Sequence, residues 1–288
     1  MVNRVIAIFE RKLHIMNCAK EREQNWLWLT IPIAALIIVA AGSGLFIQDV
    51  YKASSIFVAG IALGADVVTL LIALPILVIG AIFTKRGSQR ARLICLGILG
   101  YVMYNYLLIA FMVSFNLFFL VYLALLGCSA FALLGGLLNT SFEKVKALFP
   151  DNTPVRFVSI CFFAVVAIFY PVWLAEIIPA HVTGELPRMI KWAETPTHAY
   201  YVLDLALLFP VLGLTGVWLW QKWAVGYTLA GIFLTFLAVE TLTIVSGMLF
   251  SVHIGLPYPI FPEILIYIVG SICVLVVQIW YLKNMKAP

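Results

Sequence analysis

The stretch WAVGYTLAGIFLTFLAVETLTIVSGML, residues 223–249, decides the class of fold. It contains one charged residue, Glu240, and it exceeds the roughly 20 helical residues that cross a ~30 Å hydrocarbon core. Because lipid offers the backbone no hydrogen-bond partners, such a run crosses a membrane as a helix. The stretch therefore predicts a transmembrane helix with a single acid inside it.

The rest of the chain follows the same pattern. Of its 288 residues, 64% are hydrophobic and only 11% are charged, whereas soluble domains carry about 25% charged residues. We therefore predict an all-α fold, a polytopic transmembrane helical bundle with about eight spans. The expected spans are 26–48, 56–83, 92–113, 117–138, 156–178, 199–220, 223–249 and 260–282.

Basic residues predict how the chain is oriented. With eight spans and the N-terminus inside, all but three of the 18 Lys and Arg residues fall on the inner side. The exceptions are Lys52, Arg188 and Lys191. Cytoplasmic loops of membrane proteins are enriched in Lys and Arg, so we expect both chain ends in the cytoplasm.

A repeated pattern divides the chain into two halves. Two spans each carry an Asp and then a Pro and precede a Lys: Asp66, Pro75 and Lys85 in the first, Asp204, Pro210 and Lys222 in the second. This order predicts two tandem four-helix membrane units, as in transporters with parallel repeats. In chain order we expect a cytoplasmic amphipathic or polar leader at 1–25, the first unit at 26–139, a cytoplasmic linker at 140–155 and the second unit at 156–283.

Three acids lie inside predicted spans, namely Asp66, Asp204 and Glu240. An ionised side chain at the bilayer centre costs roughly 2.5–3.5 kcal/mol on insertion scales, so such groups face a protein interior or a water-filled cavity. Counted along their helices, the three acids reach comparable depth in the outer half, and we expect them to meet there. In the alternative, the two aspartates lie near helix N-termini, where the helix dipole favours negative charge.

The span at 92–113 adds Tyr101, Tyr104 and Asn105, which share one helix face. An unpaired amide is costly in the bilayer, so Asn105 is expected to face the interior. A hydrogen bond between helices is the simpler role for it. Together with the three acids, these residues form the predicted pathway for a substrate or an ion.

His181, His198 and His253 fall in outer segments and are weak candidates for a metal site. Their spacing matches no known ligand set, so we expect solvated loop histidines and neither a metal nor another cofactor. The chain also has no GxxxxGK[ST] phosphate-binding loop and no HExxH motif.

Lys85, Arg86, Arg90 and Arg92 form a basic cluster on the inner side. The cluster is suited to contact anionic lipid head groups, or it serves as a topology determinant alone. Aromatic residues at span ends, Trp173 among them, are typical of an interfacial belt. Membrane lipids are the expected partners; nucleic acid is not, and the sequence indicates no particular protein partner.

Two stretches, 85–127 and 198–220, carry a recognisable set of residues. The set is Arg86-Gly87-Ser88 with Arg92, Gly100-Tyr101 with Tyr104 and Tyr106, Asn116 with Phe119 and Tyr122, and Asp204-Leu205. In these residues, about half of the chain resembles a family of uncharacterised bacterial multi-pass membrane proteins. The resemblance implies a location in the bacterial inner membrane and implies no activity.

Three functions remain open at this point. The first is a transporter of a small molecule, lipid or ion through a polar cavity in the outer half. The second is a membrane-embedded enzyme acting on a lipid or isoprenoid at the outer leaflet. The third is a non-catalytic membrane subunit or sensor, in which the polar residues only join helices.

Overall fold

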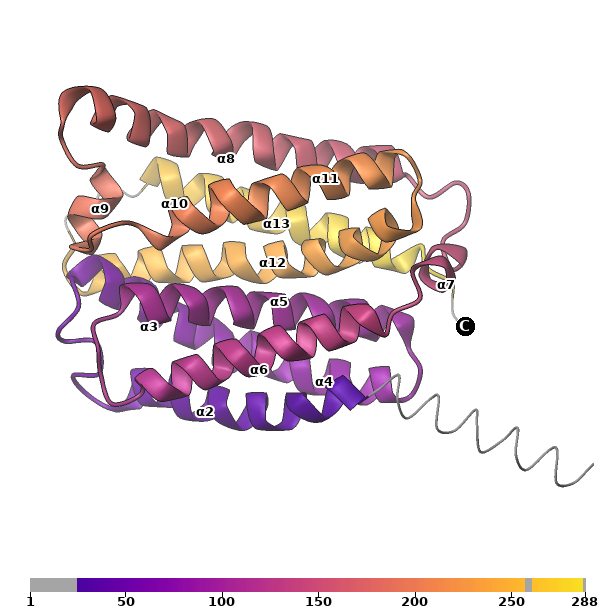
Figure 1. Cartoon of the computed structure of the whole chain (residues 1–288), viewed down its shortest axis with the longest axis horizontal. Coiled ribbons are helices and arrows are strands. Elements are labelled where there is room, and N and C mark those ends of the chain that lie inside the picture. The colour runs from indigo at the N-terminus through magenta and orange to yellow at the C-terminus, as the bar shows by residue number, and fades with distance from the viewer. Residues whose placement is uncertain (1–24, 257–260, 287–288) are drawn as a thin grey trace, which may run out of the picture.

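A computed structural model of the chain describes residues 25–256 and 261–286 and shows, in that part of the chain, a bundle of helices without strands (Figure 1). Within these ranges, eight helices are long and apolar enough to cross a membrane. The prediction of an all-α, multi-pass integral membrane protein is thus confirmed. The spans are Asn25–Phe46, Ile56–Lys85, Gln89–Met112, Phe119–Leu138, Val155–Thr183, Ala199–Trp220, Ala224–His253 and Ile264–Lys283. The leader predicted at 1–25 lies, except for Asn25, outside the described residues.

Short segments interrupt or connect some of these spans. In chain order the described elements are η1 (Asn25–Leu29), α2 (Thr30–Phe46), α3 (Ile56–Val68), η2 (Thr69–Ala73), α4 (Leu74–Lys85), α5 (Gln89–Met112), α6 (Phe119–Leu138), α7 (Phe142–Ala147), α8 (Val155–Thr183), α9 (Arg188–Ala193), α10 (Ala199–Leu203), η3 (Asp204–Leu208), α11 (Phe209–Trp220), α12 (Ala224–His253) and α13 (Phe261–Lys283). The segment η1 is a 3₁₀-helix, whereas η2 and η3 are π-helical turns.

The two ends of the bundle differ in charge. The helix α7 and the last described residues lie at one end, and α9 lies at the other (Figure 1). The first end, here named the basic end, carries Lys85, Arg86, Arg90, Arg92, Lys144, Lys146, Arg156, Lys222, Lys283 and Lys286. The opposite end carries Lys52, Arg188 and Lys191.

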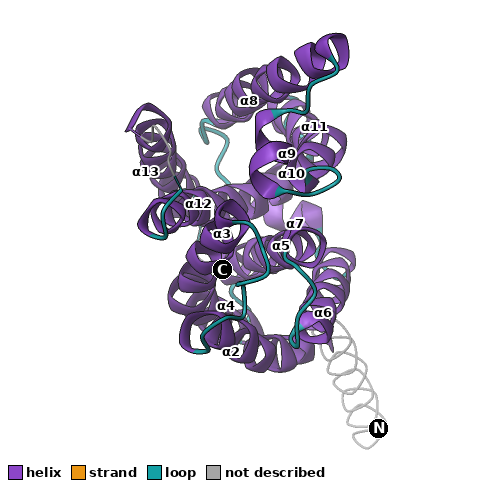
Figure 2. Ribbon diagram, turned by 90° about the vertical axis from the view of Figure 1, so that its left-hand side faces the viewer, coloured by secondary structure: helices purple, strands orange, loops and turns teal. Residues whose placement is uncertain are grey.

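The helices α5 and α12 form the centre of the bundle. They are the most buried of the spans, and α12 packs against α3, α5, α11 and α13. The end-on view in Figure 2 shows α3 and α13 beside α12. Glycines permit this close packing. A Cβ added at Gly64 of α3 would meet the backbone nitrogen of Gly247 at 2.2 Å, and one added at Gly97 of α5 would meet Cβ of Thr235 at 2.5 Å. Small residues at helix crossings are typical of membrane bundles.

Two π-helical turns interrupt the second and sixth spans, and each comes just before a proline. The turn η2 leads into α4, whose second residue is Pro75, and η3 leads into α11, whose second residue is Pro210. Proline donates no backbone hydrogen bond, and its ring collides with the carbonyl group four residues back in a regular α-helix. A wider turn relieves this collision, so the two prolines mark two breaks in long helices.

The broken helices and the helices that follow them repeat at a constant offset. The turn η2 begins at Thr69 and η3 begins at Asp204, an offset of 135 residues, the difference between 204 and 69. The same offset relates the starts and ends of α4 and α11, and the starts of α5 and α12. The connecting turns match as well, because Ser88 N donates to Phe83 O at 3.0 Å and Trp223 N donates to Trp218 O at 2.8 Å. The α4–α5 and α11–α12 hairpins therefore have equivalent backbones.

The outer helices of the two halves are arranged differently. The helix α2 packs directly on α6, whereas α8 meets α13 through the ring pairs Phe157–Trp280 and Phe169–Tyr267. The superposition of residues 26–139 on residues 156–283 as whole four-helix units stays a prediction.

Candidate functional site

The six residues of the predicted pathway are all buried in the bundle. The exposed fraction of the side chains does not exceed 8% in Asp66, Tyr101, Tyr104, Asn105, Asp204 and Glu240. Burial removes water, so each of their polar atoms needs a partner inside the protein. The hydrogen-bond partners divide the acids into two groups.

Asp66 of α3 pairs with a tyrosine from the preceding loop. Tyr51 Oη donates to Asp66 Oδ2 at 2.6 Å. The pair occupies the space beside Gly44 of α2, where a Cβ would come within 1.9 Å of Asp66 Oδ2. Burial, followed by the negative charge of Asp66, raises the pKa of Tyr51 well above its ordinary value of 10.0. The tyrosine hydroxyl is therefore a permanent donor to this acid.

Asp204, the first residue of η3, accepts two hydrogen bonds. Tyr104 Oη of α5 donates to Asp204 Oδ1 at 2.5 Å, and Trp173 Nε1 of α8 donates to Oδ2 at 2.9 Å. Such bonds stabilise a carboxylate that has lost its water. The expectation that Trp173 belongs to an interfacial belt is wrong. Its ring is buried, because the indole N–H finds its acceptor inside the bundle.

Of the three acids, Glu240 of α12 is the one that has no hydrogen-bond partner among the described residues. It is 5% exposed, and among the described residues neither of its carboxyl oxygens accepts a hydrogen bond. Asp204 lies within electrostatic range of Glu240, and Tyr104 and Tyr200 lie within electrostatic range of both acids. Glu240 and Asp204 thus form a pair in which one carboxyl group is well hydrogen-bonded and the other is not.

Asn105 occupies the position in α5 that corresponds to Glu240 in α12 by the hairpin offset. Its amide nitrogen is buried and has no hydrogen-bond partner within the described ranges. The interhelical hydrogen bond expected for Asn105 is therefore not seen from this nitrogen. The two central helices thus each have, at these equivalent positions, a buried polar side chain with an atom that lacks a hydrogen-bond partner among the described residues.

Tyr101 of α5 links η2 to α12 through two threonine hydroxyl groups. Its hydroxyl lies 2.8 Å from Thr69 Oγ1 of η2 and accepts a hydrogen bond from Thr243 Oγ1 at 3.0 Å. Thr243 follows Glu240 by one helical turn on the same face of α12. Tyr101 therefore links the first π-helical turn to the region of Glu240, whereas Asp66 and Asp204 accept hydrogen bonds from different donors.

Two of the histidines lie on helices. His181 is in the last turn of α8 and His253 ends α12, so the expectation of loop positions for them is wrong. The two helices continue past their apolar runs, because polar residues are tolerated at the membrane surface. Among the described residues, no group of three or more His, Cys, Asp or Glu side chains is arranged to hold a metal ion.

His198 differs from the solvated residue that we expected. It precedes α10 and is fully buried against the rings of Phe57, Tyr200 and Tyr201. In the described part of the chain neither ring nitrogen has a hydrogen-bond partner. Burial lowers the pKa of His198 from 6.5 to about 4, although the charge of Glu176 opposes this shift.

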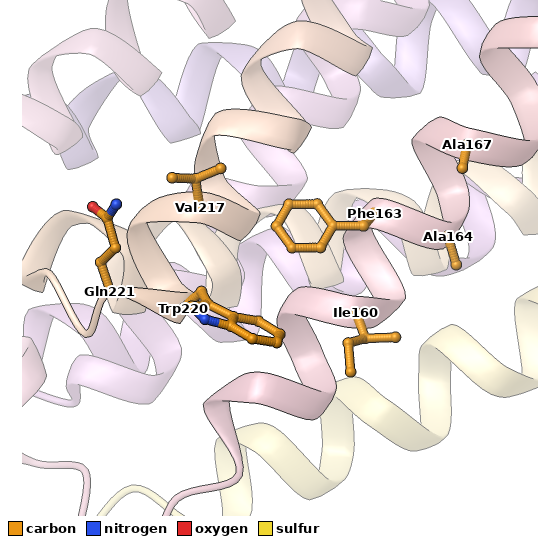
Figure 3. Close-up of a pocket in the computed structure, with 7 residues that line it drawn as sticks. All are labelled: Ile160, Phe163, Ala164, Ala167, Val217, Trp220 and Gln221. Atoms are coloured by element: carbon orange, nitrogen blue, oxygen red, sulfur yellow. The ribbon is translucent and has the colours of Figure 1, made fainter.

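The six residues of the predicted pathway line neither of two grooves on the surface of the described residues. The first, here named the α8–α11 groove, has a volume of about 580 Å³. Figure 3 shows it between Phe163 of α8 and Val217 and Trp220 of α11. The second, here named the four-helix groove, has a volume of about 430 Å³ and is lined by α4, α5, α12 and α13, with Ile72 of η2.

The basic cluster predicted to contact lipid separates into different environments. Arg92 is buried, and its Nη1 donates to the carbonyl oxygen of Asn139 at 3.0 Å. Lys85 and Arg86 lie over aromatic rings. Arg90 lines the four-helix groove. Lipid contact at these residues stays a prediction.

No family model matches the chain, and no curated protein or solved structure matches it either. The resemblance to a family of bacterial membrane proteins therefore remains a prediction.

Sequence reasoning missed three partners of the site, namely Tyr51, Thr69 and Trp173. No local pattern distinguishes Tyr51 or Trp173 from other aromatic residues near span ends. Thr69 could have been predicted, because an alignment of Pro75 with Pro210 places Thr69 at the position equivalent to Asp204.

Proposed function

We propose that the chain is a proton-coupled transporter of a small molecule, lipid or ion, with Glu240 as its proton-binding group. One observation carries this proposal: Glu240 is buried, and within the described residues neither carboxyl oxygen has a hydrogen-bond partner. An ionised carboxylate in that environment is costly, since transfer of an unpaired charge into a low-dielectric medium is strongly unfavourable. Binding of a proton neutralises the carboxylate and removes this cost. The site therefore suits a carboxyl group that is protonated in one conformation of the protein and ionised in another.

The environment of Asp204 supports the same assignment. Asp204 accepts hydrogen bonds from Tyr104 and Trp173, whereas Glu240 accepts none from described residues. Neighbouring carboxyl groups in unlike environments are the arrangement that separates the proton-carrying group from the ionised one. A change in the distance between the two acids would alter the proton affinity of Glu240, because like charges oppose each other's ionisation.

The π-helical turns supply a place where such a change can occur. Asp204 is the first residue of η3, and Tyr101 binds Thr69, the first residue of η2. Discontinuous helices near the membrane midplane are common in transporters, and π-turns are frequent at functional sites. A shift of hydrogen-bond register in η3 would move Asp204 relative to Tyr104 and Glu240.

The orientation belongs to the same proposal. The basic end faces the cytoplasm of a bacterial inner membrane, because Lys and Arg are retained on the cytoplasmic side. Reporter fusions after Lys85, after Lys146 and at the C-terminus should all report the cytoplasm. A periplasmic result at any of the three contradicts this topology.

Proton coupling is tested with the purified full chain in vesicles that contain a pH-sensitive dye. Pulses of Na⁺, K⁺, amino acids, sugars and short-chain lipids are applied under an imposed pH gradient. At least one class of solute should change the internal pH with the wild type. Glu240→Gln should abolish that change, whereas Glu185→Gln, at an exposed glutamate outside the predicted pathway, should keep it. Equal proton flux in the wild type and Glu240→Gln contradicts the proposal. Chemical conversion of an added lipid without proton flux would favour the membrane-embedded enzyme.

A further inference from the structure

The four-helix groove combines an apolar wall with positive charge at one end. Ile94 of α5, Leu242 of α12 and Leu275 of α13 are among the residues that line it. At the basic end its lining includes Arg90, the second residue of α5, and Lys283, the last residue of α13. None of the described residues that line the groove is acidic.

Arg90 has capacity to bind a ligand. Its Nε is buried and has no hydrogen-bond partner in the part of the chain that the structure describes. Gln278, in the same groove, is already engaged, because its Nε2 donates to Thr235 Oγ1 at 2.9 Å. A guanidinium group that is incompletely hydrogen-bonded inside the protein is stabilised when an anionic oxygen atom in the groove lies beside it.

The apolar part of the groove extends away from these charges along the helices. Leu275 precedes Lys283 by two turns of α13, roughly 12 Å at 1.5 Å per residue. Leu242 lies beyond the middle of α12, which begins at Ala224 near the basic end. The groove thus begins at head-group depth and continues into the hydrocarbon region.

We propose that the four-helix groove binds an anionic phospholipid of the surrounding bilayer. The phosphate group lies between Arg90 and Lys283, and an acyl chain lies along Ile94, Leu275 and Leu242. Basic pockets between transmembrane helices on the cytoplasmic side recognise anionic head groups in this manner. A zwitterionic lipid carries its own cation, so its attraction to the two basic residues is weaker. This site is independent of Glu240 and adds a lipid requirement to the proposed transport.

The α8–α11 groove provides an internal comparison. Its lining is apolar apart from Gln221, and none of its described lining residues is charged. The nearby guanidinium of Arg156 already lies over the Trp220 ring, with 5.7 Å from Cζ to the ring centroid. This groove is therefore expected to take acyl chains without preference for a head group.

Native mass spectrometry of the full chain tests the proposal, with equimolar phosphatidylglycerol and phosphatidylcholine of the same acyl chains in the micelles. The wild type should retain phosphatidylglycerol roughly ten-fold over phosphatidylcholine, given the attraction of each basic residue for anionic lipid. The double variant Arg90→Gln/Lys283→Gln should lose this preference. Lys144→Gln/Lys146→Gln removes the same charge from α7 at the same end and should keep it.

A second variant tests the apolar part without changing charge. Leu275→Trp fills the groove and should lower retention of phosphatidylglycerol while the protein stays folded, because Leu275 is exposed to lipid. Equal retention of the two lipids by the wild type overturns the proposal. So does an equal loss in the α7 control, unchanged retention in Leu275→Trp, or displacement of the lipid by excess inorganic phosphate, which would show that the cations alone make the site.

Discussion

The α4–α5 and α11–α12 hairpins have equivalent backbones and different chemistry. The first hairpin has Thr69 at the start of its π-helical turn, where the second has Asp204. The first has Asn105 in its central helix, where the second has Glu240. Two neutral polar side chains thus correspond to two acids. The repeated scaffold thus sets where polar groups are buried, while the second half alone has acids at both of these positions.

The halves also differ in how their broken helices contact the opposite central helix. The helix α3 packs closely on α12, with Gly64 against Gly247. By the hairpin offset the equivalent residues are Ala199 and Met112, and α10 touches α5 over a shorter stretch. The glycine contact is therefore a feature of one interface and not of the repeat.

The largest effect is expected at this glycine contact. Gly64→Val would place side-chain atoms against the backbone of α12, and overpacking of a rigid site costs about 3 kcal/mol or more. Ala199→Val, the equivalent change in the second half, should cost clearly less. Thermal unfolding in detergent measures both, with Gly127→Ala as a control because a Cβ there meets nothing within 4 Å. A similar loss of stability in Gly64→Val and Ala199→Val would show that the two interfaces are packed equally tightly.

The next largest effect is expected at the starts of the π-helical turns. Asp204→Leu leaves the Tyr104 hydroxyl and the Trp173 indole N–H buried without an acceptor, at about 1–3 kcal/mol each. Thr69→Val removes one hydrogen bond from Tyr101, which still accepts from Thr243, and should cost about 1 kcal/mol. Unfolding curves for the two variants should therefore be well separated. A loss at Thr69 as large as that at Asp204 would show that both turns depend equally on their polar residue.

The spans were predictable because the bilayer imposes one simple rule on the sequence. A long apolar run has to be a helix, so all eight spans were identified from runs such as 223–249. The ends of α8 and α12 were placed too early, because His181 and His253 are polar but still helical. An apolar run predicts the part of a helix that is embedded in lipid. It does not predict the residue at which the helix ends.

The site was predictable only in part, for a related reason. Burial of Asp66, Asp204 and Glu240 follows from the cost of an acid in lipid. The hydrogen-bond donors to these acids depend on which helices pack against each other, and no local sequence pattern predicts that packing. Trp173 and His198 illustrate this, because an interfacial ring and a buried ring have the same sequence signature.

The entrance to the second broken helix should respond to pH where the first does not. His198 corresponds by the offset to Leu63, which does not titrate. The folded-state pKa of His198, about 4, lies below its ordinary value of 6.5. The contribution of the neutral ring to the free energy of unfolding is therefore complete above pH 6.5 and is lost as the pH falls toward 4. The loss is up to roughly 1.4 kcal/mol per pH unit in that window. Unfolding free energies from pH 7 to 4.5 should fall less steeply in His198→Phe, and equal slopes contradict the burial of a neutral ring.

The smallest effect is expected at the connecting turns of the hairpins. Gly87 and Lys222 occupy equivalent left-handed positions, with φ of 97° and 59°. Gly87→Ala should cost about 1 kcal/mol, because a side chain is unfavourable in this region. Lys222→Gly relieves the same backbone strain in the folded state, but it also raises the conformational entropy of the unfolded chain. These two effects on the free energy of unfolding nearly cancel. Unfolding midpoints of both variants measure this, and a large loss for Lys222→Gly would show that the turns are not equivalent.

Glu240, and not its counterpart Asn105, is the residue that we propose to bind a proton inside the bundle. Infrared difference spectra of the protein in lipid, recorded between acid and alkaline pH, measure the carbonyl stretch of protonated carboxyl groups directly. We predict a component of this band that titrates in the wild type, disappears in Glu240→Gln and persists in Asn105→Gln. A band that is unchanged in Glu240→Gln would contradict the account, because the proton would then reside on another acid.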